Sequence, residues 1–315
     1  MRNKNITSLA CALALCCAGC SNKDFYDKEM YHPVLYMLSE GTQKVYTVVL
    51  PFNQTNPTAY FSVGCGGSMP NPEEVTIVME PDTLLFDRFN RSNYDIDTAK
   101  YARLLSPDRY DIPSYTVTMP ANSPDQYVKV PIRVNHQGLS PDSIYLVPLA
   151  IKSVSRYEVN PDKANMLFRV AVENDYAEQV ALTLYLQRGT ITTGATVTPV
   201  NASKIVNPLS ADEIRVFAGN AVQSNATTLA DIIKYAITLK INPDNTVTFT
   251  PYGTIEVEPL TTFANYNRYY IAIDLETEKK IQSFDLHYRY RTLTSANPVT
   301  WSAWSEVRET LQRSN

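Results

Sequence analysis

Short segments rich in β-branched and aromatic residues, separated by proline and by Asn/Asp turns, constrain the fold of this chain most strongly. The sequence has 20 prolines and only 10 glycines. Segments of about four to eight such residues are typical of strands. In the first half of the chain, roughly seven or eight of them predict an antiparallel β-sandwich. Clear examples are residues 45–50, 58–63, 75–79, 115–119, 126–134, 143–151 and 164–172.

Two of these segments contain a proline, which predicts where they lie in a sheet. Residues 126–134 alternate between apolar and polar side chains. Pro131 has no N–H to donate to a neighbouring strand, so we expect an edge strand there. Residues 143–151 are apolar along most of their length, which predicts a central strand or one bulged at Pro148.

A stretch from Thr83 to Ile112 interrupts the strand pattern. Residues 97–105 have helical spacing, with Asp97 as a cap and Pro107 as a stop, so we expect a short helix there. The rest is predicted to be a loop insertion, and an insertion of about 30 residues in a sandwich is often functional.

The second half of the chain is also composed of strand-like segments. Residues 235–241 and 246–250 flank an Asn-Pro-Asp-Asn turn and predict a hairpin. Residues 228–233 are the one plausible helix. We therefore predict an all-β chain whose second domain is an antiparallel β-sandwich or a barrel-like β domain. Two further predicted strands are residues 268–274 and 283–290.

The first residues predict a targeting signal. Two basic residues precede an apolar run at 6–18, which has signal-peptide length and is too short to span a bilayer. Ala18 and Gly19 place two small residues before Cys20. This resembles the cleavage site of bacterial lipoproteins, with Cys17 where a leucine is usual. The alternative is a plain secretory signal cut near Cys20.

These patterns divide the chain into four segments. We expect a lipoprotein signal peptide at residues 1–19 and a lipidated tether at 20–32, with acyl chains on Cys20 as the membrane anchor. A first β domain at 33–174 and a second, ligand-binding β domain at 175–315 follow. The boundary is short and polar, so we expect the two domains to touch.

The five cysteines do not form a disulfide framework. Three leave with the predicted signal peptide and Cys20 is lipidated, so only Cys65 remains and no intramolecular disulfide is possible. Cys65 ends an apolar segment with no histidine nearby in sequence. We expect a buried small hydrophobe rather than a nucleophile.

Charge and composition argue against several function classes. The net charge of −4 gives no electrostatic reason to bind nucleic acid. The presence of only three histidines argues against a multi-histidine metal centre unless carboxylates supply most of the ligands, and the few glycines leave little for phosphate-binding loops. We therefore expect no nucleic-acid partner, no cofactor and no metal.

The carboxylates give little support for catalysis. A retaining glycosidase needs two carboxyl groups about 5 Å apart. Asp95/Asp97 and Glu256/Glu258 place two acids on one strand face each, where such pairs are usually solvated. Hydrolase motifs such as Gly-x-Ser-x-Gly are absent from the sequence. We expect no enzyme activity; a hydrolase that depends on Glu256 or Asp95 is the alternative.

Several β motifs recur in an order seen in a known family. They are residues 115–123, 128–134, 145–149, 151–155, 159–160, 216–219, 237–241, 288–291 and Trp304. In this order the chain resembles Bacteroidota surface lipoproteins of polysaccharide-utilisation loci. These pair an N-terminal immunoglobulin-like domain of unknown function with a C-terminal β domain of unknown function. The resemblance implies an immunoglobulin-like first domain and glycan capture beside outer-membrane importers; it supplies no binding residues.

The C-terminal half carries the best candidate binding residues. Sugar rings stack their C–H faces on aromatic rings, and their hydroxyls pair with Asp, Asn or Arg. Tyr266, with Asn267 and Arg268 beside it, lies in a predicted loop, and Trp301 and Trp304 are the two tryptophans. On a loop or short turn the tryptophans face the same way; on a strand they face opposite ways. Alternatively, Trp304 closes a core and Trp301 seals a barrel end.

The insertion at 86–110 is a second candidate place, because it combines aromatic residues with polar ones. The alternative is that its aromatics attach the insertion to the sandwich. The polar candidates are Arg88, Asn90, Arg91, Asn93, Asp95 and Arg109.

Together these features predict a monomeric lipoprotein, anchored in the outer membrane and facing the cell exterior. We expect the C-terminal domain to bind oligo- or polysaccharide without catalysis and to pass this glycan to outer-membrane importer proteins. The N-terminal sandwich would act as a spacer. The alternative is a structural or protein-partner subunit of a surface complex, or an adhesin.

Overall fold

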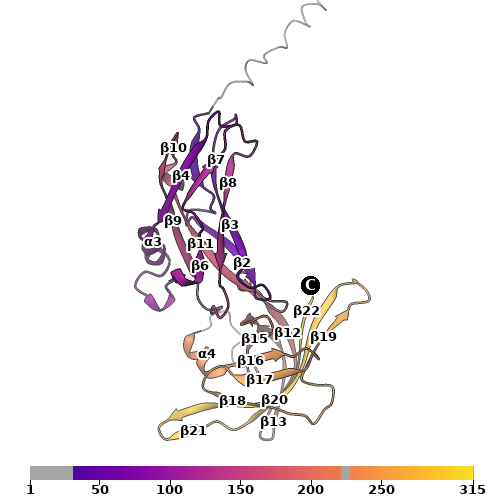
Figure 1. The fold of residues 1–315 in the computed structure, drawn as a ribbon. Helices are drawn as coiled ribbons and strands as arrows, with labels where there is room; N and C mark the ends of the chain where they lie inside the picture. The colour runs from indigo at the N-terminus through magenta and orange to yellow at the C-terminus, as the bar shows by residue number, and fades with distance from the viewer. Residues whose placement is uncertain (1–30, 221–227, 315) are drawn as a thin grey trace, which may run out of the picture.

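The computed structural model describes residues 31–220 and 228–314, which form two β domains placed end to end (Figure 1). The predicted signal peptide and Cys20 lie outside the described residues. In the described part, strands dominate and the α-helices are α3 (Thr83–Tyr94) and α4 (Leu229–Tyr235). The predicted all-β fold class is confirmed. Within these ranges no helix is both long enough and apolar enough to cross a membrane.

The N-terminal domain is a sandwich of two sheets. One has the order β10-β1-β3-β8-β6, and the other has the order β2-β11-β9-β4-β7 with β5 paired to β9. Most neighbours are antiparallel, but β1–β10, β2–β11 and β5–β9 are parallel pairs. The strands are β1 (Val34–Met37), β2 (Val45–Pro51), β3 (Thr58–Cys65), β4 (Val75–Pro81), β5 (Arg103–Leu104), β6 (Tyr110–Asp111), β7 (Thr116–Met119), β8 (Tyr127–Val134), β9 (Tyr145–Val154), β10 (Glu158–Val159) and β11 (Asn165–Glu173).

Alternating side chains build the core between these sheets. On β11, Phe168 and Val170 point into the core, while Leu167 and Arg169 lie on the opposite face under α3. Cys65 is buried in the same core, as predicted.

The central position predicted for Pro148 is confirmed, whereas the strand that contains Pro131 is not the edge of its sheet. Beyond β8, the two-residue strand β6 pairs only with Arg133 and Val134, so Pro131 has no partner strand on that side. Pro148 lies in β9, which is central between β11 and β4.

The predicted helix at 97–105 is wrong, because the helix forms earlier in the insertion. Asp82 caps α3 by accepting a hydrogen bond from the Leu85 N–H at 3.1 Å. Leu85 and Phe89, four residues apart, then pack against the sheet face that points away from the main core of the N-terminal domain. Residues 97–105 instead form a 3₁₀ turn and the short strand β5.

The C-terminal domain also has two sheets. A seven-stranded sheet has the order β13-β12-β22-β20-β18, with β19 and β21 also paired to β20, and a four-stranded sheet has the order β14-β15-β16-β17. The predicted hairpin is β16–β17, and Thr228 caps α4 close to the predicted helix. The strands are β12 (Leu184–Thr193), β13 (Thr196–Ile205), β14 (Asn207–Pro208), β15 (Glu213–Phe217), β16 (Ala236–Ile241), β17 (Val247–Pro251), β18 (Ile255–Pro259), β19 (Arg268–Ile273), β20 (Lys280–Ala296), β21 (Val299–Trp301) and β22 (Ser305–Ser314).

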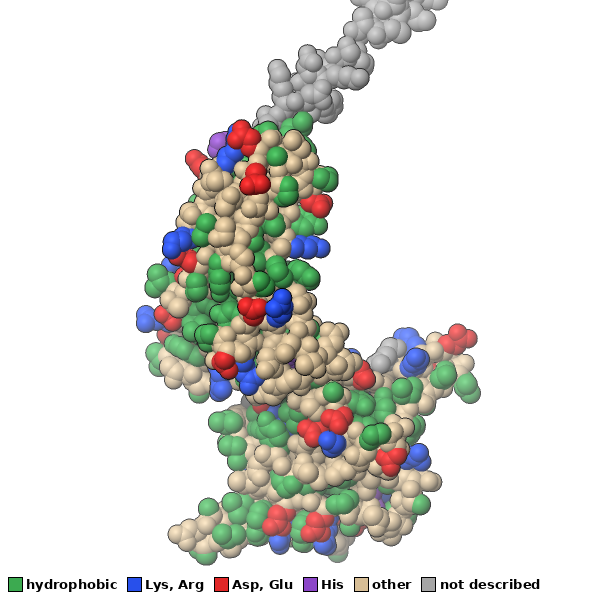
Figure 2. All heavy atoms as spheres, in the orientation of Figure 1, with side chains coloured by type: hydrophobic (Ala, Val, Ile, Leu, Met, Phe, Trp, Pro, Cys, Tyr) green, Lys and Arg blue, Asp and Glu red, His purple; other side chains and the backbone are tan. Residues whose placement is uncertain are grey.

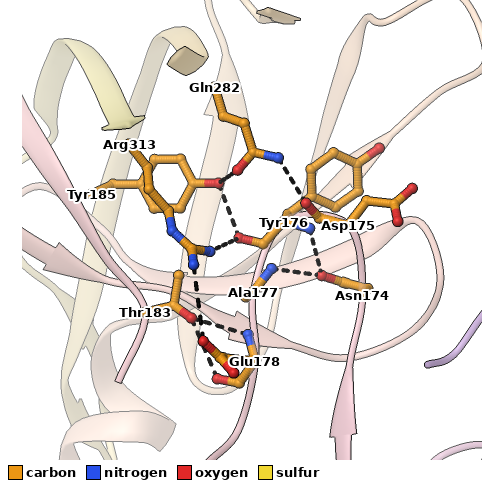
Figure 3. Close-up of polar contacts among 9 residues, drawn as sticks. All are labelled: Asn174, Asp175, Tyr176, Ala177, Glu178, Thr183, Tyr185, Gln282 and Arg313. Carbon is orange, nitrogen blue, oxygen red and sulfur yellow. Dashed lines mark hydrogen bonds and ion pairs between the residues drawn. The ribbon is translucent and has the colours of Figure 1, made fainter. Parts of the chain in front are cut away.

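The segment between the domains, residues 174–183, is fixed to the C-terminal domain by hydrogen bonds (Figure 3). The buried Tyr185 hydroxyl lies 2.9 Å from the carbonyl oxygen of Tyr176 and 2.9 Å from Oε1 of Gln282. Gln282 Nε2 in turn donates to the carbonyl oxygen of Asp175 at 2.7 Å. The segment between the domains is therefore an ordered part of the C-terminal domain and not a free linker.

The two domains touch beside this segment. Arg215 on β15 forms a two-pronged ion pair with Asp142 of the N-terminal domain, and its Nη2 donates to Oδ1 at 2.6 Å. Gln179 Nε2 donates to the carbonyl oxygens of Pro141 (3.0 Å) and Ser143 (2.9 Å). Figure 2 shows the two lobes meeting at this narrower waist.

Candidate functional site

The seven-stranded sheet has one face in the core of the C-terminal domain and one face directed away from it. Along β20, Leu286 and Tyr288 are buried in the core, and His287, Arg289 and Arg291 alternate with them on the opposite face. We call that opposite face the outer face. It carries Glu256 and Glu258 of β18, His287, Arg289 and Arg291 of β20, and Glu306 and Arg308 of β22.

Two arginines of the outer face each join a carboxylate to a tryptophan. Arg289 Nε donates to Glu258 Oε2 at 2.7 Å, and its guanidinium carbon lies 4.5 Å from the centre of a Trp304 ring. Arg291 Nε donates to Glu256 Oε2 at 2.5 Å. The pairs form because register places Glu256 opposite Arg291 and Glu258 opposite Arg289.

Both tryptophans lie over the same guanidinium. The Arg291 guanidinium carbon is 4.7 Å from a Trp304 ring centre and 5.2 Å from a Trp301 ring centre. Trp301 is in β21 and Trp304 follows it in an irregular turn, so the two face the same way. Both are partly exposed, and neither belongs to a core cluster of the described residues. The alternative that they close a core does not describe this structure.

A second aromatic group surrounds Arg308. Its guanidinium carbon lies 4.6 Å from the ring centre of Phe263 and 5.1 Å from that of Tyr266, and Arg308 Nε donates to the Tyr266 hydroxyl at 2.8 Å. Across residues 31–220 and 228–314, no carboxylate lies within 4.0 Å of this guanidinium. A hollow of about 290 Å³ adjoins it, lined in part by Arg188 and Thr190.

Phe263 and Tyr266 also cover His287. Their ring centres lie 5.3 Å and 5.8 Å from that of the imidazole, which is buried. His287 Nε2 lies 2.8 Å from Glu306 Oε1, and Nδ1 is enclosed without a partner. The ring is therefore held by packing and by one carboxylate.

The structure gives the two other predicted site residues different positions. Asn267 has a positive φ of 57°. Its side-chain amide is hydrogen-bonded within the fold: Nδ2 donates to the Leu260 carbonyl oxygen at 3.0 Å, and Oδ1 accepts from the His287 N–H at 2.7 Å. It fixes the loop that carries Tyr266. Arg268 is exposed at the start of β19, opposite Asp285.

The other face of the same strands encloses a polar cluster. Glu309 of β22 is 2% exposed and accepts hydrogen bonds from Lys204 Nζ at 2.7 and 2.8 Å. Gln187 Nε2 donates to it at 2.5 Å and the Tyr288 hydroxyl at 2.9 Å. Since every member is paired, this cluster belongs to the domain core rather than to a ligand site.

The insertion at 86–110 is largely attached to the sandwich. Buried Asn90 exchanges two hydrogen bonds with the backbone of Ala102, at 2.8 and 3.2 Å. Arg109 Nη1 donates to the carbonyl oxygen of Gln137 at 2.8 Å. Phe89 packs inward, which supports the alternative that the aromatics attach this segment. Arg88 and Arg91 are exposed on α3 beside Asn93, and Asp95 ends the helix.

The carboxylate pairs have structural partners. Glu256 and Glu258 do share one strand face, as predicted, and each is tied to an arginine. Asp95 and Asp97 do not lie on a strand; Asp97 pairs with Lys100. In the part of the chain that the structure describes, no group of three or more His, Cys, Asp or Glu residues could hold a metal.

Sequence reasoning missed the arginines of the outer face. The alternation Tyr288-Arg289-Tyr290-Arg291 was available as a signal, because it places both arginines on the face opposite two core tyrosines. Its meaning depends on strand register, which brings β18 and β21 to either side of β20.

Two family models match the chain. One describes an N-terminal domain and matches residues 26–158, and the other describes a C-terminal domain and matches residues 164–312. No curated protein sequence matches.

Solved structures from Bacteroides share the fold. A Bacteroides ovatus protein of unknown function has a TM-score of 0.66 and 16% identity, covering 90% of this chain and 95% of its own. A multidomain B. ovatus protein including DUF1735 has a TM-score of 0.61 and 14% identity, covering 89% and 94%. A Bacteroides thetaiotaomicron protein described as an auxiliary nutrient binding protein has a TM-score of 0.57 and 15% identity, covering 86% and 91%.

Proposed function

The chain belongs to the family of two-domain β proteins that the paired N-terminal and C-terminal models describe, and from this premise we propose that its outer face binds an oligo- or polysaccharide without catalysis. The observation that carries the proposal is the presence of two partly exposed aromatic groups on one sheet face. Trp301 and Trp304 form one group, and Phe263 and Tyr266 form the other.

The spacing of the two groups suits a linear glycan. The tryptophan group lies beside Arg291 and the Phe263/Tyr266 group beside His287. These two positions of β20 are four residues apart, which corresponds to roughly 13 Å along a strand. Aromatic rings offer stacking surfaces for sugar C–H faces, and the adjacent Arg and Glu side chains offer partners for hydroxyl groups. The description of a neighbour with the same fold as a nutrient binding protein agrees with capture rather than turnover.

We propose that the protein is anchored through Cys20 in the outer membrane, faces the exterior and delivers its glycan to an importer. The arrangement of the domains supports a spacer role for the N-terminal sandwich. The described chain begins at the end of that domain that lies far from the C-terminal domain (Figure 1). The outer face would then be held away from the membrane.

Calorimetry and affinity electrophoresis against plant, host and microbial glycans test the proposal. The native protein should bind at least one of them, and a Trp301→Ala/Tyr266→Ala variant should lose that binding. Tyr60→Ala is the matched control, because Tyr60 is 49% exposed in the N-terminal domain, far from the outer face. No binding across the panel, or equal binding by the double variant, would contradict the proposal.

One observation favours a protein partner as a second candidate. Strand β19 pairs with β20 on one side, and on its other side the described residues pair only at its start, where Arg268 bridges Thr246. Its Ile271 and Ile273, beyond that bridge, are 55% and 62% exposed. An open edge with apolar side chains suits strand addition by another chain. Under this alternative, complex assembly would survive in the Trp301→Ala/Tyr266→Ala variant and fail when Ile271 and Ile273 are changed to lysine.

A further inference from the structure

A pocket in the N-terminal domain lies apart from the outer face. It has a volume of about 640 Å³, within the usual range for small-molecule sites. Its floor is the outward side of β2, β9 and β11, where Thr47 and Leu146 flank Arg169 by register. One wall is the end of α3, with Phe89, Asn93 and Tyr94, and the other is the loop at residues 40–43.

Arg169 lies in this pocket without a partner. Its Nε is fully enclosed and has no acceptor. Among residues 31–220 and 228–314, no carboxylate lies within 4.0 Å of its guanidinium, and no hydrogen bond from its terminal nitrogens is formed. By contrast, the buried Arg215 has a two-pronged pair with Asp142.

Arg169 is partly buried, and its Nε has lost contact with water without gaining an acceptor, which is unfavourable for the folded protein. Burial accordingly lowers the pKa of Arg169, and the nearby Tyr94 opposes that effect only in part. The arrangement becomes favourable when an anionic group occupies the pocket and accepts from the guanidinium.

The other walls indicate what kind of anion fits. Thr47 and Gln43 offer groups that pair with hydroxyls, while Phe89 and Tyr94 offer ring surfaces. The two walls are joined by a hydrogen bond of 2.6 Å from Gln43 Nε2 to Asn93 Oδ1, so the pocket is preformed. No second Lys or Arg lines it, and Glu40 stands on one wall, so one negative charge suits the pocket better than two.

We propose that this pocket binds a small hydroxylated carboxylate, such as an acidic monosaccharide, whose carboxylate pairs with Arg169. The planar guanidinium fork matches a carboxylate in a two-pronged geometry. The site lies in the domain that otherwise acts as a spacer, so the inference stands or falls independently of glycan binding at the outer face.

Thermal melting and calorimetry with galacturonate, glucuronate, galactose, glucose and inorganic phosphate test the proposal. A uronate should raise the melting temperature saturably, while the uncharged sugars should not and phosphate should have a smaller effect. Arg169→Met should abolish the response without lowering the melting temperature of the ligand-free protein, because no existing pair is lost. Arg88→Met, which removes an exposed arginine from α3, is the matched control and should respond like the native protein.

Two further variants keep the test decisive. If Arg169→Met does not fold, Arg169→Lys keeps the charge but loses the fork and should weaken uronate binding at least tenfold. The Trp301→Ala/Tyr266→Ala variant should keep the response, which separates this pocket from the outer face. The proposal is overturned if no uronate binds, if Arg169→Met still binds, or if phosphate or the uncharged sugars bind equally well.

Discussion

Both faces of the seven-stranded sheet carry ion pairs beside aromatic rings, but the pairs of one face are buried and those of the other are exposed. On the inner face, Glu309 pairs with Lys204 out of contact with water, and Tyr288 completes its hydrogen bonds. On the outer face, Glu258 pairs with Arg289 beside Trp304, with both charged side chains 42–49% exposed.

Exposure to water accounts for the difference. A buried charge pair is strongly coupled, and losing one partner leaves an uncompensated charge in a medium of low polarity. An exposed pair exchanges its partners for water at little cost. The inner cluster is therefore committed to the fold, whereas the outer pairs can rearrange with little loss of stability.

The largest effect is expected when the inner pair is broken. Glu309→Ala removes the only carboxylate beside Lys204 in the described chain and should lower the free energy of unfolding by about 3–5 kcal/mol. Denaturant unfolding measures this change. Glu256→Ala is the matched control on the outer face and should cost about 1 kcal/mol or less. Similar losses for both variants would show that the two faces do not differ.

The sequence was sufficient to predict the all-β class and many of the strands, although not β13 or β22. Alternation and proline positions predicted the central strand with Pro148 and the hairpin after Tyr235, whereas the edge strand expected at Pro131 has the short strand β6 beyond it. These features depend on side chains close together in sequence. The order of the two domains could also be inferred, from the order of the motifs that the family models then matched.

The rest depends on contacts between distant segments. Residues 97–105 have helical spacing, yet Asn90 holds Ala102 in an extended segment through two backbone hydrogen bonds. Likewise, nothing local to Trp301 or Trp304 shows that Arg291 lies close to both rings, because register with β20 sets that position. The lack of a partner for Arg169 also depends on the folded chain, because distant strands and the end of α3 form its surroundings.

A smaller effect is expected from the outer aromatic groups. Trp304→Ala should weaken binding of a glycan identified by the panel about tenfold, or about 1.4 kcal/mol, because it removes one stacking surface. The melting temperature should change little, since Trp304 is outside the core clusters. Calorimetry and thermal melting on the same variant check both. Lost stability with unchanged affinity would instead assign Trp304 to the fold.

Alkaline pH should affect the inner face through its tyrosines. Burial, followed by the charge of Glu309, raises the pKa of Tyr288, and burial likewise raises that of Tyr185. An unfolded phenol loses its proton near pH 10, whereas these stay protonated in the fold. Their contribution to stability should therefore be complete below about pH 10 and decline as the pH rises above it. Unfolding measured from pH 8 to 11 checks this, and Tyr288→Phe should show a shallower decline.

The smallest effect should come from a single outer ion pair. Glu258→Gln keeps the shape of the side chain and removes its charge from Arg289, so the free energy of unfolding should fall by about 0–1 kcal/mol, and less in high salt. Arg289 keeps its contact with Trp304, so the ring should stay in place and glycan affinity should remain within a few-fold of the native value. Unfolding at low and high salt, with calorimetry on the same variant, measures both quantities. A loss as large as that of Glu309→Ala would mean that the outer charges hold the sheet together, and the outer face could not then rearrange around a ligand.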